Sequence, residues 1–113
     1  MKKIKTLKKN YEFKNVLNKG KFYIGKQITV YIIKNTEKTN RIGIAVSSKL
    51  CNAVKRNNIK RKIRENYRLI ENKLKKGYQF VFLWNKKVPV EQVDFYIIKD
   101  DMKYIFSKAG ILE

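Results

Sequence analysis

Three segments of the sequence carry apolar residues three or four positions apart, the spacing that gathers side chains on one face of a helix. They predict helices over residues 11–19, from Asn52 to about Lys76, and from Asp94 to Gly110. Asn52 and Asp94 are placed as N-caps, as is Asn10 for the first helix. The apolar faces consist of Phe13, Val16 and Leu17; of Ile59, Ile63, Tyr67, Ile70 and Leu74; and of Phe95, Ile98, Met102, Ile105 and Phe106.

Three other segments have the apolar pattern of strands. Residues 27–34 and 41–47 alternate, and residues 78–83 form a run of aromatic and β-branched side chains typical of a buried strand. The polar residues 35–40 predict a hairpin connection, and residues 84–93, which contain the only proline, predict an extended loop. One face of the second strand has only small side chains, which leaves room for a close approach to the sheet: Gly43, Ala45 and Ser47.

The order of these elements predicts an α+β fold, a single-domain sandwich of helices on a small, mostly antiparallel sheet. The order is α-β-β-(β)-α-β-α, and residues 1–113 are long enough to bury a core as one domain. Residues 1–9 are basic and aperiodic, so we expect them to form a flexible basic arm. The longest apolar run, Tyr78–Trp84, is far too short to span a membrane.

The charge of the chain points to an anionic partner. Lysine and arginine total 28 against 9 aspartate and glutamate residues, which gives a net charge of +19. Residues 1–90 carry 25 of the basic and 4 of the acidic residues, so the surface for a polyanion is expected there. Histidine, the usual general base, is absent from the sequence, and there is one cysteine. The composition therefore favours a cytoplasmic, polyanion-binding domain over the common kinds of enzyme.

Four of the five arginines fall within the second predicted helix, which a general excess of lysine does not explain. At about 100° per residue, Asn57, Arg61, Arg64 and Arg68 turn away from the apolar face, while Arg56 and Lys60 lie on the flank nearer the sheet. We call this set the arginine face: Arg56, Asn57, Lys60, Arg61, Arg64 and Arg68. Guanidinium groups match phosphate oxygens in bidentate pairs, so the arginine face predicts contact with nucleic acid. Additional phosphate contacts are expected at the start of the helix, from Lys49, Asn52 and Lys55.

The alternative interpretation of the arginine face is a solvated polar surface. Between Lys49 and Lys76 only Glu65 and Glu71 can compensate the basic residues. Like charges one turn apart destabilise a helix unless an anion is bound, which favours the nucleic-acid interpretation.

A second candidate surface is aromatic. Phe13 of the first helix and Tyr31 of the first predicted strand can line a shared groove with Leu17 and Thr29. Aromatic rings beside a basic surface stack the unpaired bases of single-stranded RNA. For Phe13 and Leu17, packing in the core is the alternative, because helical spacing alone accounts for both. Tyr31 is the better candidate, since its neighbour on the same strand face, Thr29, is polar.

The remaining reactive side chains predict neither a catalytic nor a metal site. Asp100 and Asp101 are adjacent on a helix, so their carboxylates diverge and a surface pair is expected. Asp94 is expected to cap its helix, and Cys51 has no second cysteine or histidine to act with. We therefore expect no catalytic residue, no metal ligand and no cofactor bound by the protein itself.

The segment from Val46 to Glu65 resembles the signature of the bacterial ribonuclease P protein component. That signature has V-S-x-K, then A-V, then an R-N-R-x-K-R-x-x-R-E core, and the matching residues here are Arg56, Asn57, Lys60, Arg61, Arg64 and Glu65. Leu7 to Phe13 followed by Gly20, and Lys108 to Leu112, are similar to the family's start and end.

Three residues depart from that family pattern. Asn58 stands where a second arginine is usual, Cys51 where glycine is frequent, and Leu17 where an aromatic residue is expected. The first departure weakens or shifts one contact of the arginine face, and the third thins the aromatic groove.

The resemblance implies a small subunit of a ribonucleoprotein endonuclease that removes the 5′ leader of precursor transfer RNA. The ribonuclease P RNA and its Mg²⁺ ions would perform the hydrolysis, and the protein, a monomer in the particle, would dock on that RNA through the arginine face. The leader would lie in a cleft between the first helix and the sheet, lined by Phe13, Leu17, Thr29 and Tyr31. The implied fold is ribosomal protein S5 domain 2-like, with a left-handed crossover through the long helix.

Two other functions are compatible with the residues taken alone. One is a structural RNA-binding protein of the ribosomal type, and the other is a nonspecific DNA-compacting protein. All three functions predict steep salt dependence, so salt does not separate them. Binding of precursor and mature transfer RNA, compared in the presence of the catalytic RNA, does.

Overall fold

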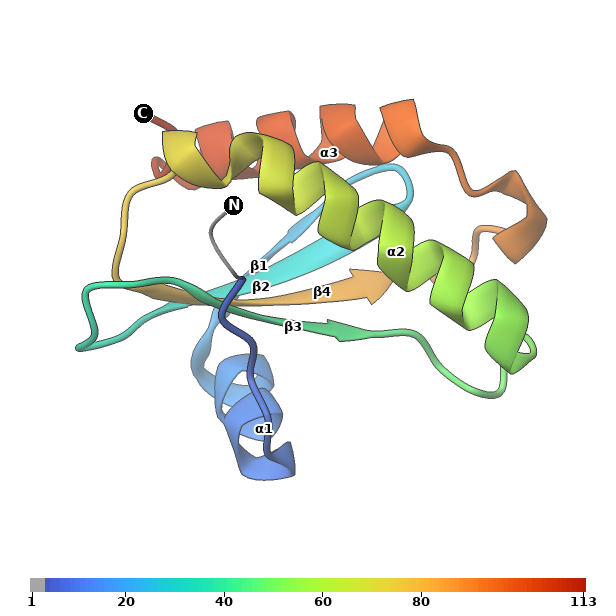
Figure 1. The fold of residues 1–113 in the computed structure, drawn as a ribbon, viewed down its shortest axis with the longest axis horizontal. Helices are drawn as coiled ribbons and strands as arrows, with labels where there is room; N and C mark the ends of the chain where they lie inside the picture. Colours follow the sequence, from blue (N-terminus) through green and yellow to red (C-terminus); the bar gives the residue numbers. More distant parts are fainter. Residues whose placement is uncertain (1–3) are drawn as a thin grey trace.

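A four-stranded mixed sheet forms the centre of the computed structural model, which describes residues 4–113 (Figure 1). The strands are β1 (Lys21–Ile24), β2 (Ile28–Lys34), β3 (Arg41–Ala45) and β4 (Tyr78–Trp84), in the order β1-β2-β4-β3. The pairs β1–β2 and β2–β4 are antiparallel, and β3 runs parallel to β4. The expected α+β class and the mostly antiparallel sheet are confirmed.

The strand order differs from the sequence prediction. We expected residues 35–40 to join two neighbouring strands, but β4 lies between β2 and β3. β4 is the most apolar strand, and the central position covers both of its edges and both of its faces. The hairpin is instead formed by β1 and β2, with Phe22 opposite Tyr31. The predicted order allowed a third strand before the long helix, and β1 makes up that number. Its residues were not assigned, because four residues are too few to show a clear alternation.

The parallel strands β3 and β4 are connected by the long helix α2 (Ala53–Ile70). In Figure 1 the chain leaves the end of β3, runs back above the sheet as α2, and returns as β4 behind β3. This path is the left-handed crossover that the resemblance implied, and it departs from the right-handed rule for such connections.

The helices cover both faces of the sheet. α2 and α3 (Phe95–Lys108) pack against each other on one face, and α1 (Asn10–Lys19) lies on the opposite face (Figure 1). Short 3₁₀ helices occupy Glu71–Lys73 and Val90–Gln92. Within residues 4–113, no helix has the length and apolar character needed to cross a membrane.

The predicted N-caps of α2 and α3 are confirmed. Asn52 Oδ1 accepts a hydrogen bond of 3.0 Å from the backbone N–H of Lys55. Asp94 Oδ1 accepts from the backbone N–H groups of Tyr96 and Ile97, at 2.8 and 3.2 Å. Both side chains therefore satisfy N–H groups that the first turn of a helix leaves without a partner.

Two predicted helix boundaries are wrong. Asn10 was expected to cap α1 but is its first residue, and the cap position is Lys9. The carboxylate of Glu12 accepts the Lys9 N–H at 3.0 Å and so closes the first turn from inside the helix. The second helix ends at Ile70 rather than near Lys76, because the chain tightens into a 3₁₀ turn before it enters β4.

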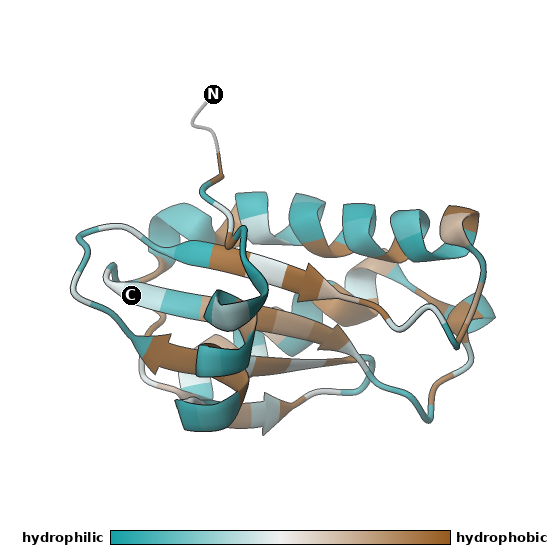
Figure 2. Ribbon diagram, turned by 90° about the horizontal axis from the view of Figure 1, so that it is seen from below, coloured by the Kyte–Doolittle hydropathy of each residue, from teal (hydrophilic) through white to brown (hydrophobic). Residues whose placement is uncertain are grey.

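The main core lies between the sheet and the α2–α3 layer, and aromatic rings fill much of it. The ring centroids of Phe80 and Phe106 are 5.0 Å apart, and those of Tyr67 and Phe82 are 5.9 Å apart. Figure 2 shows largely hydrophobic strands and a hydrophilic outer side of α2. The apolar faces predicted for the two long helices are buried here, except for the half-buried Phe95: Ile59, Ile63, Tyr67, Ile70, Leu74, Ile98, Met102, Ile105 and Phe106.

The flexible arm expected at residues 1–9 is wrong for the part that the structure describes. Ile4 and Leu7 are buried, and the backbone pairs with β3. The Leu7 N–H donates to the Ile42 carbonyl at 2.8 Å, and the Ile42 N–H donates to the Lys5 carbonyl at 3.0 Å. Two apolar residues among many lysines therefore suffice to extend the sheet edge. The expected arm at residues 1–3 lies outside the described residues.

The expected surface pair Asp100–Asp101 is also wrong in part, because Asp101 is buried. Its carboxylate accepts three backbone N–H groups from the turn between β1 and β2, those of Lys26, Gln27 and Ile28, at 2.8, 2.8 and 3.1 Å. Asp101 therefore ties the β1–β2 hairpin to α3, and Asp100 remains exposed.

Candidate nucleic-acid interface

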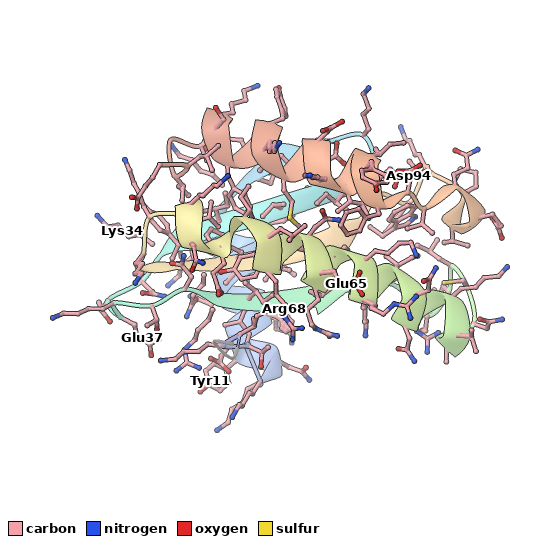
Figure 3. All side chains as sticks on the ribbon, turned by 45° about the horizontal axis from the view of Figure 1, so that its top comes forward. Tyr11, Lys34, Glu37, Glu65, Arg68 and Asp94 are labelled. Carbon is pink, nitrogen blue, oxygen red and sulfur yellow. The ribbon has the colours of Figure 1, made fainter. Side chains whose placement is uncertain are left out.

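The arginine face lies on the outer side of α2, opposite the helix's buried residues. Asn57, Arg61, Arg64 and Arg68 are exposed, while Arg56 and Lys60 are half-buried at its border with the sheet. Figure 3 shows Arg68 on the side of α2 that faces away from α3. The periodicity of the sequence therefore placed these six side chains on the surface that the structure gives them.

Local contacts hold part of the arginine face in place. Arg61 Nη2 and Lys62 Nζ both donate to Asn58 Oδ1 at 3.0 Å, and Arg61 Nε lies 3.8 Å from a carboxylate oxygen of Glu65. Arg56 Nη1 donates to the carbonyl of Cys51 at 2.9 Å, in the loop before the helix. Asn58 thus supplies a hydrogen-bond acceptor where the family pattern has its second arginine.

Arg64 and Arg68 differ from these residues. Neither guanidinium makes a hydrogen bond or an ion pair with any other residue of 4–113. Both retain all five N–H donors for a ligand, and the two residues are one helical turn apart. A spacing of about 6 Å along the helix axis allows the two to contact neighbouring phosphates.

The three residues expected to add phosphate contacts lie at the start of α2 and are exposed. Asn52 Oδ1 is occupied by the helix cap, as described above, which leaves its amide nitrogen free to donate. Lys55 Nζ lies 3.1 Å from Glu91, and this contact helps lower the pKa of the Glu91 carboxyl after the larger effect of a backbone hydrogen bond. Lys49 forms no ion pair with any residue of 4–113.

The residues predicted to line an aromatic groove lie on the opposite face of the sheet. The ring of Phe13 rests on the backbone of Gly43, where a Cβ atom would lie 2.5 Å from Phe13 Cε1. The small residues of β3 thus admit a ring, as expected from the sequence. Phe13 and Tyr31 are both half-buried and pack around Val16 and Val81. Phe13 therefore packs against the core as the alternative held, and the exposed part of its ring leaves base stacking a prediction.

Hydrogen bonds fix the polar residue Thr29 on this face of the sheet. Thr29 Oγ1 donates to Asn85 Oδ1 at 2.6 Å, and Asn85 Nδ2 donates to the carbonyl of Gly25 at 2.9 Å. Leu17 is exposed on α1. All four residues predicted for the groove, including Leu17 and Thr29, therefore belong to the side of the sheet that carries α1.

Two residues of this surface were missed by the sequence analysis, because they belong to β1. Phe22 and Ile24 leave 57% and 61% of their surface in water, and both stand on the strand face that carries Tyr31 and Thr29. The centroid of the Phe22 ring lies 5.5 Å from that of Tyr31. The run Phe22-Tyr-Ile-Gly25 was the available signal, since a glycine after an aromatic and β-branched run marks a hairpin. We use the name aromatic surface for this set: Phe13, Leu17, Phe22, Ile24, Thr29 and Tyr31.

The two surfaces lie on different sides of the sheet. The arginine face belongs to α2, above β3 in Figure 1, and the aromatic surface borders α1 below it. An RNA held on the arginine face therefore leaves the aromatic surface open to a second strand. The described residues, 4–113, contain no cluster of three or more His, Cys, Asp or Glu that could hold a metal ion.

Comparison with known protein sequences identifies the family. The family model described as Ribonuclease P matches residues 1–110. The ribonuclease P protein component of Clostridium perfringens is 36% identical over 113 residues, covering 94% of this chain and 89% of the relative. That of Clostridium botulinum is 38% identical over 106 residues, covering 93% and 94%.

Solved structures agree with the sequence comparison. The RNase P protein of Staphylococcus aureus superposes with a TM-score of 0.83 at 29% identity, covering 98% of this chain and all of that protein. The RNase P protein of Thermotoga maritima gives a TM-score of 0.81 at 27% identity, covering 92% and 96%. With a family model that spans nearly its whole length, relatives above 30% identity and the same fold, this chain belongs to the family of bacterial ribonuclease P protein components.

Proposed function

We propose that this chain docks on ribonuclease P RNA through the arginine face and binds the 5′ leader of precursor transfer RNA on the aromatic surface. The observation that carries the proposal is the presence of two exposed surfaces of different chemistry on opposite sides of one sheet. An arginine-rich helix suits the phosphates of a folded RNA, and half-exposed aromatic rings suit unpaired bases. Membership in the ribonuclease P protein family supports the pairing of these two partners.

Docking on the RNA subunit rests on the guanidinium groups of α2. Arg64 and Arg68 have all their donors free, whereas Arg61 is held by Asn58 and Glu65 in an orientation away from the core. Bidentate hydrogen bonds to phosphate oxygens fix orientation as well as supply affinity. Lys49, Asn52 and Lys55 extend the positive end of the helix toward the same RNA.

Leader binding rests on stacking. Tyr31 and Phe22 form a tilted pair, so bases of a single strand can lie against these two rings. Phe13 lies on the other side of Val81, where it packs against the same apolar cluster as Tyr31. The leader is the single-stranded part of a precursor transfer RNA, and a mature transfer RNA lacks it. The aromatic surface thus distinguishes substrate from product.

Hydrolysis of the phosphodiester bond is assigned to the RNA subunit and to Mg²⁺ ions bound by that RNA. The part of this chain is to hold the substrate against the RNA, which raises affinity and lowers the Mg²⁺ concentration required. In the particle the chain acts as a monomer. Since its proposed substrate is a bacterial transfer RNA precursor, we place the particle in the cytoplasm.

The test is reconstitution with a bacterial ribonuclease P RNA at low Mg²⁺, using precursor and mature transfer RNA labelled at the 5′ end. We expect the protein to restore leader cleavage and to bind precursor more tightly than mature transfer RNA. Tyr31→Ala should reduce this preference while the affinity for the RNA subunit stays unchanged. Equal affinity for both transfer RNAs would contradict leader binding, and it would favour a structural RNA-binding protein of the ribosomal type.

A further inference from the structure

A groove runs between the C-terminal halves of α2 and α3, away from both proposed RNA surfaces. It encloses about 870 Å³ and is closed at one end by the last residues of the chain. Asn66, Leu69, Ile70 and Lys73 line it from the α2 side. Leu69 directly follows Arg68 and so points about 100° away from it around the helix, toward α3. A molecule in this groove therefore leaves the arginine face uncovered.

The floor of the groove is aliphatic and its two edges carry exposed apolar side chains. Ile70 and Met102 are buried beneath it. Leu69 on α2 and Tyr104 on α3 remain 60% and 53% exposed. Large apolar side chains held in water on both sides of a hollow are characteristic of a binding site for another apolar surface.

The rim of the groove is cationic. Lys73, Lys99, Lys103 and Lys108 line it, and Glu113 is its single acidic lining residue. None of these lysines forms an ion pair with another residue of 4–113. Lys108 Nζ instead lies 3.2 Å from the Tyr104 hydroxyl oxygen and 5.5 Å from the centre of its ring. The groove thus combines an apolar floor with uncompensated positive charge.

We propose that this groove docks an acidic, amphipathic helix of a partner protein. The apolar side of such a helix would cover Leu69, Ile70 and Met102, and its glutamate or aspartate side chains would meet the lysine rim. Lys99 and Lys108 are nine residues apart on α3, so the groove accommodates a helix about 14 Å long. RNA fits less well, since it has no aliphatic surface to bury and the arginines of α2 lie on its other side.

The probe is a fluorescein-labelled peptide of about 16 residues, with leucines at i, i+3, i+4 and i+7 and glutamates on the flanking positions. Binding is measured by fluorescence anisotropy, and the contacted residues by shifts of backbone amide NMR signals. We expect saturable binding with shifts in the last turns of α2 and α3. A peptide of the same composition, with its leucines spread around the helix, should bind at least about tenfold more weakly.

Two matched pairs of substitutions locate the site. Lys99→Glu with Lys103→Glu should weaken peptide binding about tenfold, because two attractions become repulsions. Lys86→Glu with Lys87→Glu changes the net charge equally at two exposed positions in the loop after β4, at the opposite end of α2 (Figure 1), and should change binding less than about twofold. Leu69→Gln should weaken binding about fivefold without unfolding the protein, since Leu69 faces water.

Three results would overturn the proposal. Equal binding of the two peptides would show that charge alone drives the association. An equal effect of the loop and groove substitutions would show that the contact is not in the groove. Weaker binding of a labelled oligouridylate by the groove variants, with no change for the peptide, would identify the groove as an RNA surface instead. None of these results bears on leader cleavage, which uses the other two surfaces.

Discussion

Arg64 belongs to the proposed RNA-docking surface and makes no contact that stabilises the part of the fold that the structure describes. Its guanidinium has no partner among residues 4–113 and has cations one turn away on each side, so Arg64→Ala should not lower the melting temperature. Affinity for the ribonuclease P RNA should fall by about 1–3 kcal/mol, the value of a lost charge-assisted contact. Titration of labelled RNA measures this loss. Lys87→Ala, which removes the same charge from the loop after β4, serves as the control. An equal loss of RNA affinity in Lys87→Ala would show that Arg64 acts only through the net charge of the protein.

The hydroxyl of Tyr67 lowers the free energy of unfolding. The side chain is buried, and its oxygen has no hydrogen-bond partner within residues 4–113. Burial raises the pKa of Tyr67 above its ordinary value of 10.0, and the charge of Glu71 raises it further. Tyr67→Phe removes the unpaired hydroxyl and should increase the free energy of unfolding by about 1 kcal/mol at pH 7.

The same substitution has a pH signature. The pKa of Tyr67 is higher in the folded than in the unfolded protein, so below pH 10 the phenol is neutral in both states. In that range its titration does not change the free energy of unfolding. Above that pH the unfolded chain loses the proton first, so wild-type stability declines there while Tyr67→Phe lacks this decline. Urea unfolding at pH 7 and pH 10.5 should show a stability gap between the two proteins that widens with pH. A gap that stays constant would show that Tyr67 does not titrate differently in the two states.

At the scale of elements, Asp101 joins α3 to the hairpin that carries Phe22 and Ile24. Asp101→Asn removes the charge that accepts three N–H groups and places an amide beside them. We expect a loss of about 2–3 kcal/mol in the free energy of unfolding and faster hydrogen exchange at residues 26–28. Asp100→Asn, the exposed neighbour, loses the same charge and should change neither. Unaltered exchange at residues 26–28 in Asp101→Asn would show that the turn holds without the carboxylate.

The elements that could be predicted from the sequence are those determined by residues close together along the chain. The period of apolar residues in α2 located both its buried side and its arginine face, and Asn52 and Asp94 were recognisable as caps. The joining of Asp101 to Gln27, 74 residues away, has no local signal, and neither does the place of β4 between β2 and β3. Phe22 was missed although the run before Gly25 is a local hairpin signal, because a strand of four residues shows no clear alternation.

At the scale of the whole molecule, the fold separates functions that the sequence interleaves. The family resemblance covered nearly the entire chain, so the left-handed crossover could be anticipated although general rules favour the other hand. The sheet then places α1 on one face and α2 with α3 on the other, which yields separate surfaces for two proposed RNA contacts and one proposed protein contact. The groove between α2 and α3 had no counterpart in the sequence analysis, since it depends on how two distant helices pack.

The net charge of +19 gives salt opposite effects on the fold and on binding. The structure contains three ion pairs within residues 4–113, so repulsion between like charges destabilises the free protein. Raising NaCl from about 20 to about 300 mM shortens the screening length from roughly 20 to 6 Å and should raise the melting temperature. Affinity for RNA should fall over the same range with a log–log slope of about −3 for four arginine–phosphate contacts, and Arg64→Ala should reduce that slope by about one. Calorimetry and filter binding in the same buffers measure the two trends. A melting temperature that falls with salt would contradict this prediction. It would show that attraction within the ion pairs stabilises the fold more than repulsion between the cations destabilises it.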